Sequence, residues 1–202
     1  MTMPDGPGPG AEDGTPARPL FFERLAGLES WLEVHHCARA ELWLKLAKKS
    51  TGIASVAPEE VVDAAICFGW IDGQRRALDG EYYLQRITPR RRGSLWSLAN
   101  VRRVEALTAA GRMREPGLAE VRAARADGRW AAAYPSQKEA TAPADLVAAL
   151  ASDPRAAQRF EQLGRSARYQ MLLQLLKART PEVRAARLAR LMARLASGDE
   201  AG

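Results

Sequence analysis

Two strand-like runs on either side of an Asp-Gly pair constrain the fold of this chain more than any other feature. The runs cover residues 70–76 and 81–88, and the pair is Asp79-Gly80. An Asp-Gly pair is typical of a tight β-hairpin, because both residues tolerate the backbone angles that such a turn requires. Residues 41–48 alternate leucines with other side chains, which predicts a further strand. The sequence therefore predicts a small antiparallel sheet of about three strands.

Helical spacing of apolar residues dominates the remainder. Residues 22–35 carry one such pattern, and a second begins after Ala57-Pro58 and ends at Gly69. After Pro89 the chain is predicted to be helical throughout, apart from a loop over residues 129–142. Trp130 and Tyr134 would anchor that loop in the core. The helices after Pro89 are predicted to start at Ser97, Pro116, Asp153-Pro154 and Thr180-Pro181. The fold class that follows is α+β and predominantly α-helical.

The domain organisation follows from composition. Residues 1–19 are rich in proline and glycine and acidic on balance, which predicts a disordered tail. The remaining length and the hydrophobic content of 47% are sufficient for one buried core. We therefore expect a single domain over residues 20–197, with an α+β part at 20–115 and a helical part at 116–197. Neither a signal peptide nor an apolar stretch of about 20 residues is recognisable, so a cytoplasmic location is expected.

Positive charge is concentrated in two regions. The formal net charge is +6, and residues 84–115 contain eight arginines against two glutamates. Residues 165–195 contain eight lysines or arginines against one glutamate. Arginine binds carboxylates and phosphates through two parallel hydrogen bonds, so this distribution favours acidic partners. A GC-rich coding sequence would also enrich arginine and alanine, so composition alone does not decide between these explanations.

The strongest functional pattern is the arginine run at 90–92 that precedes a serine-rich helix start. Three consecutive arginines cannot all point into one core, and free N–H groups at a helix N-terminus attract anions. We predict a pocket between the hairpin (70–88) and the helix at 97–110, for an anionic small molecule or an acidic partner. Its arginines would hold the charge, its indoles would stack, and its polar side chains would orient the ligand. The predicted ligand-binding residues are Trp70, Gln74, Arg86, Arg90, Arg91, Ser94, Trp96, Ser97 and Asn100. The alternative is a structural network in which the arginines pair with internal acids and the tryptophans fill the core.

Asp72 is the candidate catalytic residue. It stands between a strand isoleucine and a turn glycine, where a carboxylate can act as a general acid or base. An enzyme that uses the same pocket is therefore an alternative function. The other interpretation of Asp72 is a structural salt bridge or turn hydrogen bond to Arg75, Arg86 or Arg90.

Cofactor motifs are absent from the sequence. His35, His36 and Cys37 are adjacent, and neighbouring helical side chains diverge by about 100°, so they do not form a metal shell. We therefore predict neither a metal nor a cofactor.

The closing helix carries four arginines at steps of three and four residues. Arg184, Arg187, Arg190 and Arg194 thus form one stripe, which is compatible with a nucleic-acid backbone. Association with nucleic acid is a third function to consider, and a solvated helix face would give the same pattern.

The central block resembles the YdeI/OmpD-associated (bacteriocin-protection, OmdA-like) family. The resemblance rests on a WIDG, a TPRR and a WSxxN in order within residues 65–107, and continues through 111–134 and the ARTPEVRAARLARL stretch at 178–191. It also includes WLEVHH and ELWLKLAKKS upstream, so it covers residues 20–197. Lys177-Ala178-Arg179 departs from the lysine pair that members often carry. The resemblance implies a role in resistance to bacteriocins or cationic antimicrobial agents, and implies no particular reaction, cofactor or catalytic residue.

Overall fold

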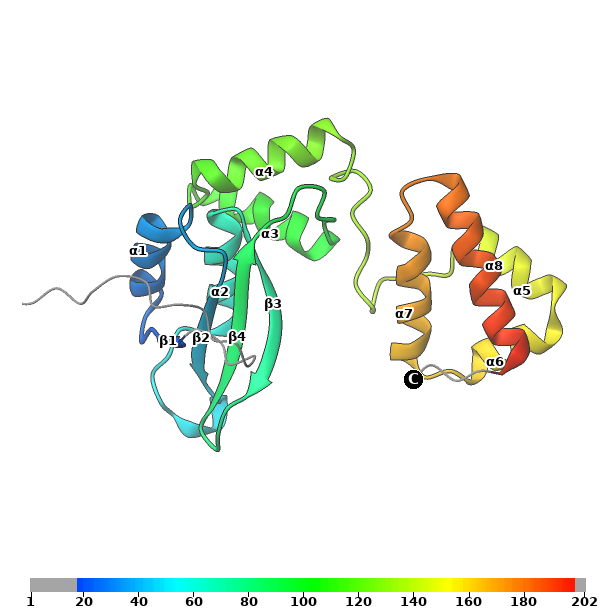
Figure 1. Cartoon of the computed structure of the whole chain (residues 1–202), viewed down its shortest axis with the longest axis horizontal. Coiled ribbons are helices and arrows are strands. Elements are labelled where there is room, and N and C mark those ends of the chain that lie inside the picture. Colours follow the sequence, from blue (N-terminus) through cyan, green and yellow to red (C-terminus); the bar gives the residue numbers. More distant parts are fainter. Residues whose placement is uncertain (1–17, 199–202) are drawn as a thin grey trace, which may run out of the picture. The chain divides into compact units, whose positions relative to one another are not determined.

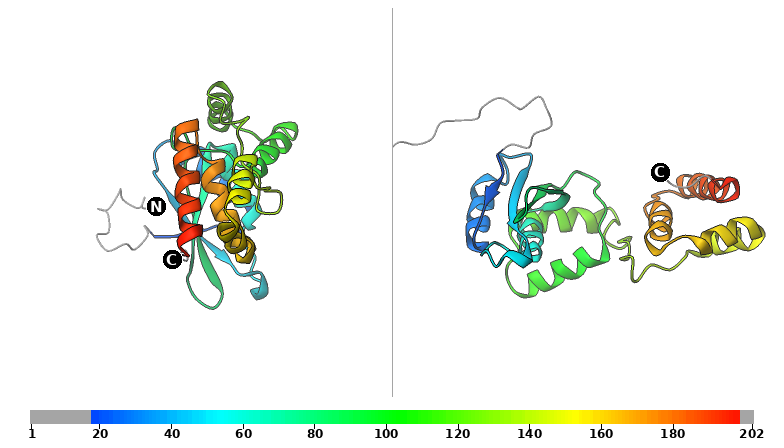
Figure 2. Two further views of the ribbon diagram at one scale, coloured as in Figure 1. Left: turned by 90° about the vertical axis from the view of Figure 1, so that its right-hand side faces the viewer. Right: turned by 90° about the horizontal axis from the view of Figure 1, so that it is seen from below.

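The computed structural model of the chain describes residues 18–198, which form two compact units (Figures 1 and 2). The N-terminal unit consists of the chain up to Ser94 together with Arg103–Asp127. The C-terminal unit consists of Leu95–Arg102 and the chain from Gly128 onward. The predicted disordered tail lies, except for its last two residues, outside the described residues. The single domain over 20–197 stays a prediction.

A four-stranded mixed sheet forms the centre of the N-terminal unit (Figure 1). Its strands, in the order β1-β2-β4-β3, are β1 Leu20–Phe21, β2 Leu42–Ala47, β4 Tyr82–Pro89 and β3 Trp70–Ala77. The predicted hairpin is confirmed, and the Asp79 carboxylate closes its turn by accepting hydrogen bonds from the N–H groups of Glu81 (2.9 Å) and Tyr82 (2.8 Å). The prediction of about three antiparallel strands needs correction, because β1 adds a fourth strand and pairs parallel to β2.

Strand β3 lies at one edge of this sheet and contains a bulge. Its register against β4 shifts between Asp72 and Arg75, so Gly73-Gln74 has no partner in the ladder. After Ile71 every residue of the strand is exposed. The edge strand is therefore irregular and polar, whereas the central strands β2 and β4 supply buried residues such as Leu44 and Ile87.

The helices of the N-terminal unit pack around this sheet. They are α1 Leu25–His35, α2 Pro58–Cys67, the part of α3 (Leu98–Ala109) from Arg103 onward, and α4 Glu115–Ala126. Helix α2 packs along β3, and α1 packs on α2. The Glu60 carboxylate accepts a hydrogen bond from the Ala57 N–H (2.8 Å), which fixes the start of α2 at the predicted position. A one-turn 3₁₀ helix, Lys49–Thr51, lies between β2 and α2.

The C-terminal unit contains the start of α3, up to Arg102, and four complete helices: α5 Ala144–Ser152, α6 Pro154–Gln162, α7 Arg165–Leu176 and α8 Pro181–Ser197. The two predicted N-caps are confirmed, because Asp153 accepts from the N–H groups of Arg155 and Ala156, and Thr180 accepts from Val183 N–H. The core is apolar and consists of Leu146, Ala156, Met171, Leu172, Leu175, Leu191 and Leu195. Eight α-helices and one sheet within residues 18–198 confirm the α+β, mainly helical class. None of these helices combines the length and the apolarity needed to cross a bilayer.

Candidate functional site

The residues of the predicted central site divide between the two units. Asp72, Gln74, Arg86 and the 90–94 segment belong to the N-terminal unit, and Trp96–Asn100 belongs to the C-terminal unit. Each group is therefore described within its own unit, and their assembly into one pocket stays a prediction.

The two tryptophans of the predicted site are core side chains. Trp70 is 1% exposed, donates its indole N–H to the His36 carbonyl (3.2 Å) and meets the Trp31 ring edge-on at 6.2 Å. Trp96 is also 1% exposed, and its ring lies 5.0 Å from that of Trp130. Burial to this degree favours the interpretation in which these indoles fill the core.

The arginines of the predicted site have different environments. Arg86 forms an ion pair with Glu41 at 2.7 Å. Arg90 is buried, and its backbone N–H donates to the Gly69 carbonyl (3.0 Å), whereas Arg91 and Arg92 are exposed. The expectation that at least one arginine of this run faces solvent is therefore confirmed.

Polar residues of the predicted site also form local hydrogen bonds with the backbone. Ser97 accepts a hydrogen bond from the Asn100 N–H (3.2 Å) and so caps α3, as predicted. The Ser94 N–H donates to the Arg91 carbonyl (2.9 Å). Ser94, Ser97 and Asn100 are half-buried.

Asp72 lies on the exposed edge strand β3. Within residues 18–198 its carboxylate has no hydrogen-bond or ion-pair partner. Arg86 pairs with Glu41 instead, and Arg75 donates to the Gln85 side chain, so the structural salt bridge expected for Asp72 is wrong for both of these arginines. Gln74 is exposed in the bulge that follows Asp72.

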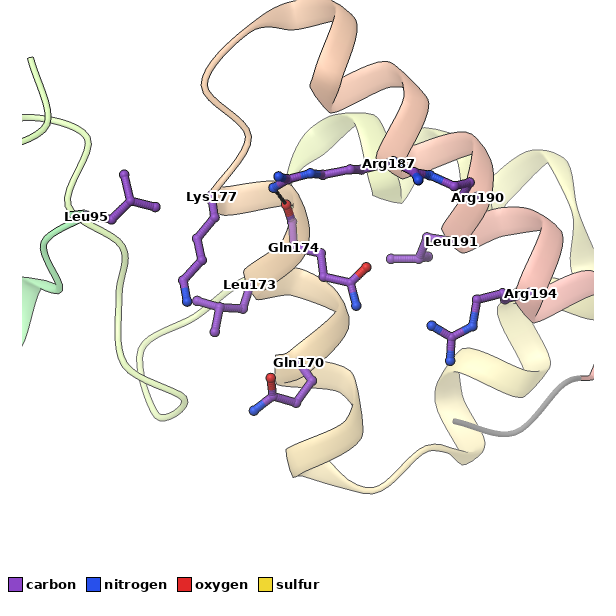
Figure 3. A pocket seen from close by; sticks show the side chains of 9 residues that line it. All are labelled: Leu95, Gln170, Leu173, Gln174, Lys177, Arg187, Arg190, Leu191 and Arg194. Carbon is purple, nitrogen blue, oxygen red and sulfur yellow. Dashed lines mark hydrogen bonds between the residues drawn. The ribbon is translucent and has the colours of Figure 1, made fainter. Parts of the chain in front are cut away.

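A basic groove lies between α7 and α8, in the C-terminal unit (Figure 3). The hollow has a volume of about 630 Å³. Its lining contains four cations, two glutamines and three leucines, and no carboxylate: Leu95, Gln170, Leu173, Gln174, Lys177, Arg187, Arg190, Leu191 and Arg194. We call these residues the basic groove.

The cations of the basic groove are positioned by backbone and ring contacts. Arg187 donates to the Gln174 carbonyl (2.6 Å), which lies near the C-terminal end of α7 (Figure 3). The Lys177 ammonium lies 4.9 Å from the centre of the Tyr134 ring, and Arg190 donates to the Ala186 carbonyl (3.3 Å) of its own helix. Within residues 18–198 no carboxylate forms an ion pair with any of the four cations. Their charge is therefore not neutralised by the described part of the chain.

Arg184 belongs to the same arginine stripe but has a different role. It binds the Asp145 carboxylate through two hydrogen bonds of 2.6 and 2.8 Å, and it donates a third to the Leu175 carbonyl (3.1 Å). The hydrogen bonds from Arg184 lower the pKa of Asp145, and the bonds to Asp145 raise the pKa of Arg184. The predicted stripe of four thus separates into one structural arginine and three that line the basic groove.

Three polar residues of the basic groove were missed by the sequence-based prediction. Gln170 and Gln174 lie on α7 and Lys177 is its C-cap, at steps of four and three residues, so the three share one face. That spacing is visible in the sequence. Only the packing of α7 against α8 shows that this face meets the arginine stripe.

The described residues contain neither a cluster of metal ligands nor a reactive thiol at Cys67. No group of three or more His, Cys, Asp or Glu side chains within the described residues is arranged to hold a metal ion. Burial raises the pKa of the Cys67 thiol to about 11, which keeps it protonated and unreactive near neutral pH.

Two family models match the chain. Residues 20–120, half of the chain, match the family described as Domain of unknown function (DUF8412). Residues 139–198 match the family described as Bacteriocin-protection, YdeI or OmpD-Associated, which confirms the predicted resemblance over this region. Comparisons with curated proteins and with solved structures gave no match. The chain therefore belongs to the DUF8412 family and carries a YdeI/OmpD-associated, bacteriocin-protection domain at residues 139–198.

Proposed function

We propose that the protein binds a small anionic molecule with at least two charged groups in the basic groove. The observation that carries this proposal is the set of four cations that line one hollow without a carboxylate among them. Like charges held close together repel one another, and a bound anion relieves this repulsion. A groove of this kind favours a ligand of opposite charge.

The spacing of the cations fits a compact polyanion. Arg194 lies seven positions after Arg187 on α8, which corresponds to about 10 Å along the helix axis. Two phosphate or carboxylate groups of one small molecule fit within this distance. Each guanidinium presents parallel N–H groups to such an anion. The side-chain amides of Gln170 and Gln174 add donors and acceptors that orient the ligand.

The charge of the basic groove also bears on bacteriocin protection, the role in the family's description. Cationic peptides are repelled by a groove lined with Lys177 and three arginines. We therefore propose that any protective role acts through an anionic ligand and not through capture of a cationic peptide at this site. The cytoplasmic location stays part of this proposal.

The test is a calorimetric titration of the full chain with pyrophosphate, citrate and ATP. We expect at least one to bind, and we expect Arg190→Glu together with Arg194→Glu to weaken that binding by more than about tenfold, since two charge-assisted contacts are lost. The matched control reverses two exposed arginines elsewhere, Arg155→Glu with Arg122→Glu, and should change the affinity by less than about threefold. Equal losses in both double variants would show that net charge alone attracts the anion, and would contradict the proposal.

Nucleic acid is a second candidate ligand, because Arg187, Arg190 and Arg194 continue in steps of three and four along α8. A twelve-nucleotide single strand, titrated at several salt concentrations, separates the two functions. A slope of the log affinity against log salt beyond about −2 indicates three or more phosphate contacts. Tight oligonucleotide binding without any small-anion binding would favour this second function.

An enzyme that uses Asp72 as a general acid or base is an alternative function. The carboxylate is exposed on an edge strand, which is compatible with substrate access, and within residues 18–198 it has no hydrogen-bond or ion-pair partner.

A further inference from the structure

A second groove lies in the N-terminal unit, where no family description or predicted site residue assigns a ligand. Its volume is about 930 Å³. One wall is the connection from the end of β2 to the start of α2, residues 47–59. The opposite wall is formed by Arg75–Ala77 of β3 and Tyr83 of β4. We call this hollow the sheet groove.

The lining of the sheet groove is mainly apolar. Ile53, Val56 and Pro58 contribute from the connection, and the ring of half-buried Tyr83 contributes from the sheet. The connection is held in place by Ser55, whose hydroxyl accepts from the Ala47 N–H (3.2 Å) and donates to the Val56 carbonyl (3.1 Å). An apolar hollow with fixed walls favours a ligand with a rigid apolar body.

Cations outnumber acids around the sheet groove. Lys48, Lys49, Arg75 and Arg76 line it, against the one carboxylate of Glu59. The Arg75 guanidinium lies 5.7 Å from the centre of the Tyr83 ring, so a positive charge stands beside an aromatic face. The Lys48 ammonium donates to the Asp79 carbonyl (2.7 Å) in the turn between β3 and β4. The cationic part of the lining therefore adjoins the apolar part.

We propose that the sheet groove binds a flat apolar molecule that carries one anionic group, such as an aromatic carboxylate, sulfonate or phosphate. The ring system lies against Tyr83 and the apolar residues of the connection. The anionic group lies between Arg75 and the lysines at 48 and 49. This ligand differs in chemistry from the compact polyanion of the basic groove, because most of its binding free energy comes from apolar burial.

The test uses 1-anilinonaphthalene-8-sulfonate, whose fluorescence rises in an apolar site. The full chain carries Arg190→Glu and Arg194→Glu throughout, so that the basic groove does not contribute to the signal. We expect saturable binding at one site, and we expect 1-naphthoate to compete at least about tenfold better than 1-naphthylmethylamine, because the amine carries the opposite charge. Equal competition by the acid and the amine would overturn the proposal.

Two further variants locate the binding. Ala77→Trp fills the groove from the exposed edge strand without changing its charge, and Arg75→Glu reverses one cation at the same edge. Each should raise the dissociation constant of the probe by about tenfold or more. The control Ala123→Trp, on an exposed position of α4, should leave it within about twofold. Circular dichroism confirms that each variant is folded. Unchanged binding in both groove variants would overturn the proposal, as would absence of any saturable binding in the parent chain.

Discussion

Arg184 joins three helices of the C-terminal unit through one side chain. Its guanidinium binds Asp145 of α5 by two parallel hydrogen bonds, while its third donor reaches the Leu175 carbonyl at the end of α7. The Leu175 carbonyl also accepts a hydrogen bond from the Ala178 N–H (3.0 Å), so Arg184 supplies a second donor to a carbonyl in the last turn of α7. The pair is about one-third exposed, and solvent therefore screens part of its attraction.

The ion pair should make the stability of the C-terminal unit dependent on pH. The folded-state pKa of Asp145 is lowered below its ordinary value of 3.8. The pair therefore stabilises the fold fully above this value, and its contribution is lost as the pH falls through the lower folded pKa. We expect Asp145→Asn to reduce stability by about 1 kcal/mol or less near pH 7, with the difference from the parent shrinking as the pH falls below the ordinary carboxyl pKa of 3.8.

Thermal unfolding followed by circular dichroism between about pH 3 and pH 7 measures this effect. Glu161→Gln serves as control, because Glu161 is exposed and its carboxylate has no ion pair within residues 18–198. A destabilisation by Asp145→Asn that is the same at every pH would show that the charge of Asp145 is not the cause.

Residue type alone indicated the roles of the site residues only in part. Tryptophan next to arginine predicted an open binding site, but Trp70 and Trp96 are both 1% exposed. An indole has a large apolar surface and one polar atom, so the same residue suits a core or a ligand site equally. The arginine stripe on α8 was predicted correctly as a helix face. Its division into structural Arg184 and the groove arginines depends on Asp145, which is 39 residues away in the sequence.

At the scale of elements, the contact between α2 and α4 depends on one small residue. Gly117 lies in the first turns of α4, where a Cβ atom would stand 2.6 Å from the Ile66 carbonyl oxygen at the end of α2. Real Cβ atoms essentially never approach an oxygen so closely. The absence of a side chain at this position therefore allows the two helices to pack at this distance.

Gly117→Ala should therefore force α4 away from α2. The expected loss of stability is about 1–3 kcal/mol, the usual range for overpacking a tight contact, although alanine favours the helix itself. Urea unfolding monitored by circular dichroism gives the free energy of unfolding. The matched control is Gly80→Ala, since a Cβ at Gly80 meets nothing within 4 Å. A Gly117→Ala protein as stable as the control would mean that the α2–α4 contact adjusts without strain.

Most elements were predictable because their signals are local. The Asp-Gly hairpin and the caps at Asp153 and Thr180 each depend on residues within a few positions of one another. Strand β1 was not predictable, because two residues cannot show a period, and its pairing with β2 joins Leu20 to Leu44 across the intervening α1. The basic groove was missed for a similar reason, since it requires two helices to be packed together.

At the scale of the whole molecule, the two family matches fall mainly in different units, although Leu95–Arg102 of the first match belongs to the C-terminal unit. Residues 20–120 include the sheet and its buried strands, and residues 139–198 include the four complete helices of the C-terminal unit. Each unit has its own core, represented by Leu46 in one and Leu175 in the other, both fully buried. Each unit also carries a groove in which cationic side chains outnumber carboxylates, and this agrees with the net charge of +6.

Separate cores predict separate responses to core mutations. Leu175→Ala should destabilise helices α5–α8 by about 2–5 kcal/mol, the usual range for removing a buried leucine side chain. Hydrogen exchange should therefore accelerate in these helices and stay nearly unchanged in β2 and β4. Leu46→Ala is the reciprocal variant and should give the opposite pattern. Acceleration of similar size in both units by either variant would show that they unfold as one.

The bulge in β3 has a consequence for how separate copies of the protein meet. A regular outer strand offers a row of unpaired N–H and C=O groups onto which a neighbouring copy can add its own strand. In this sheet the register breaks at Gly73-Gln74, and the positions beside the break carry Asp72, Arg75 and Arg76. An incoming strand would lose its register at the bulge and would bring charged groups close together. This edge of the sheet therefore resists fibre-like stacking even at high concentration.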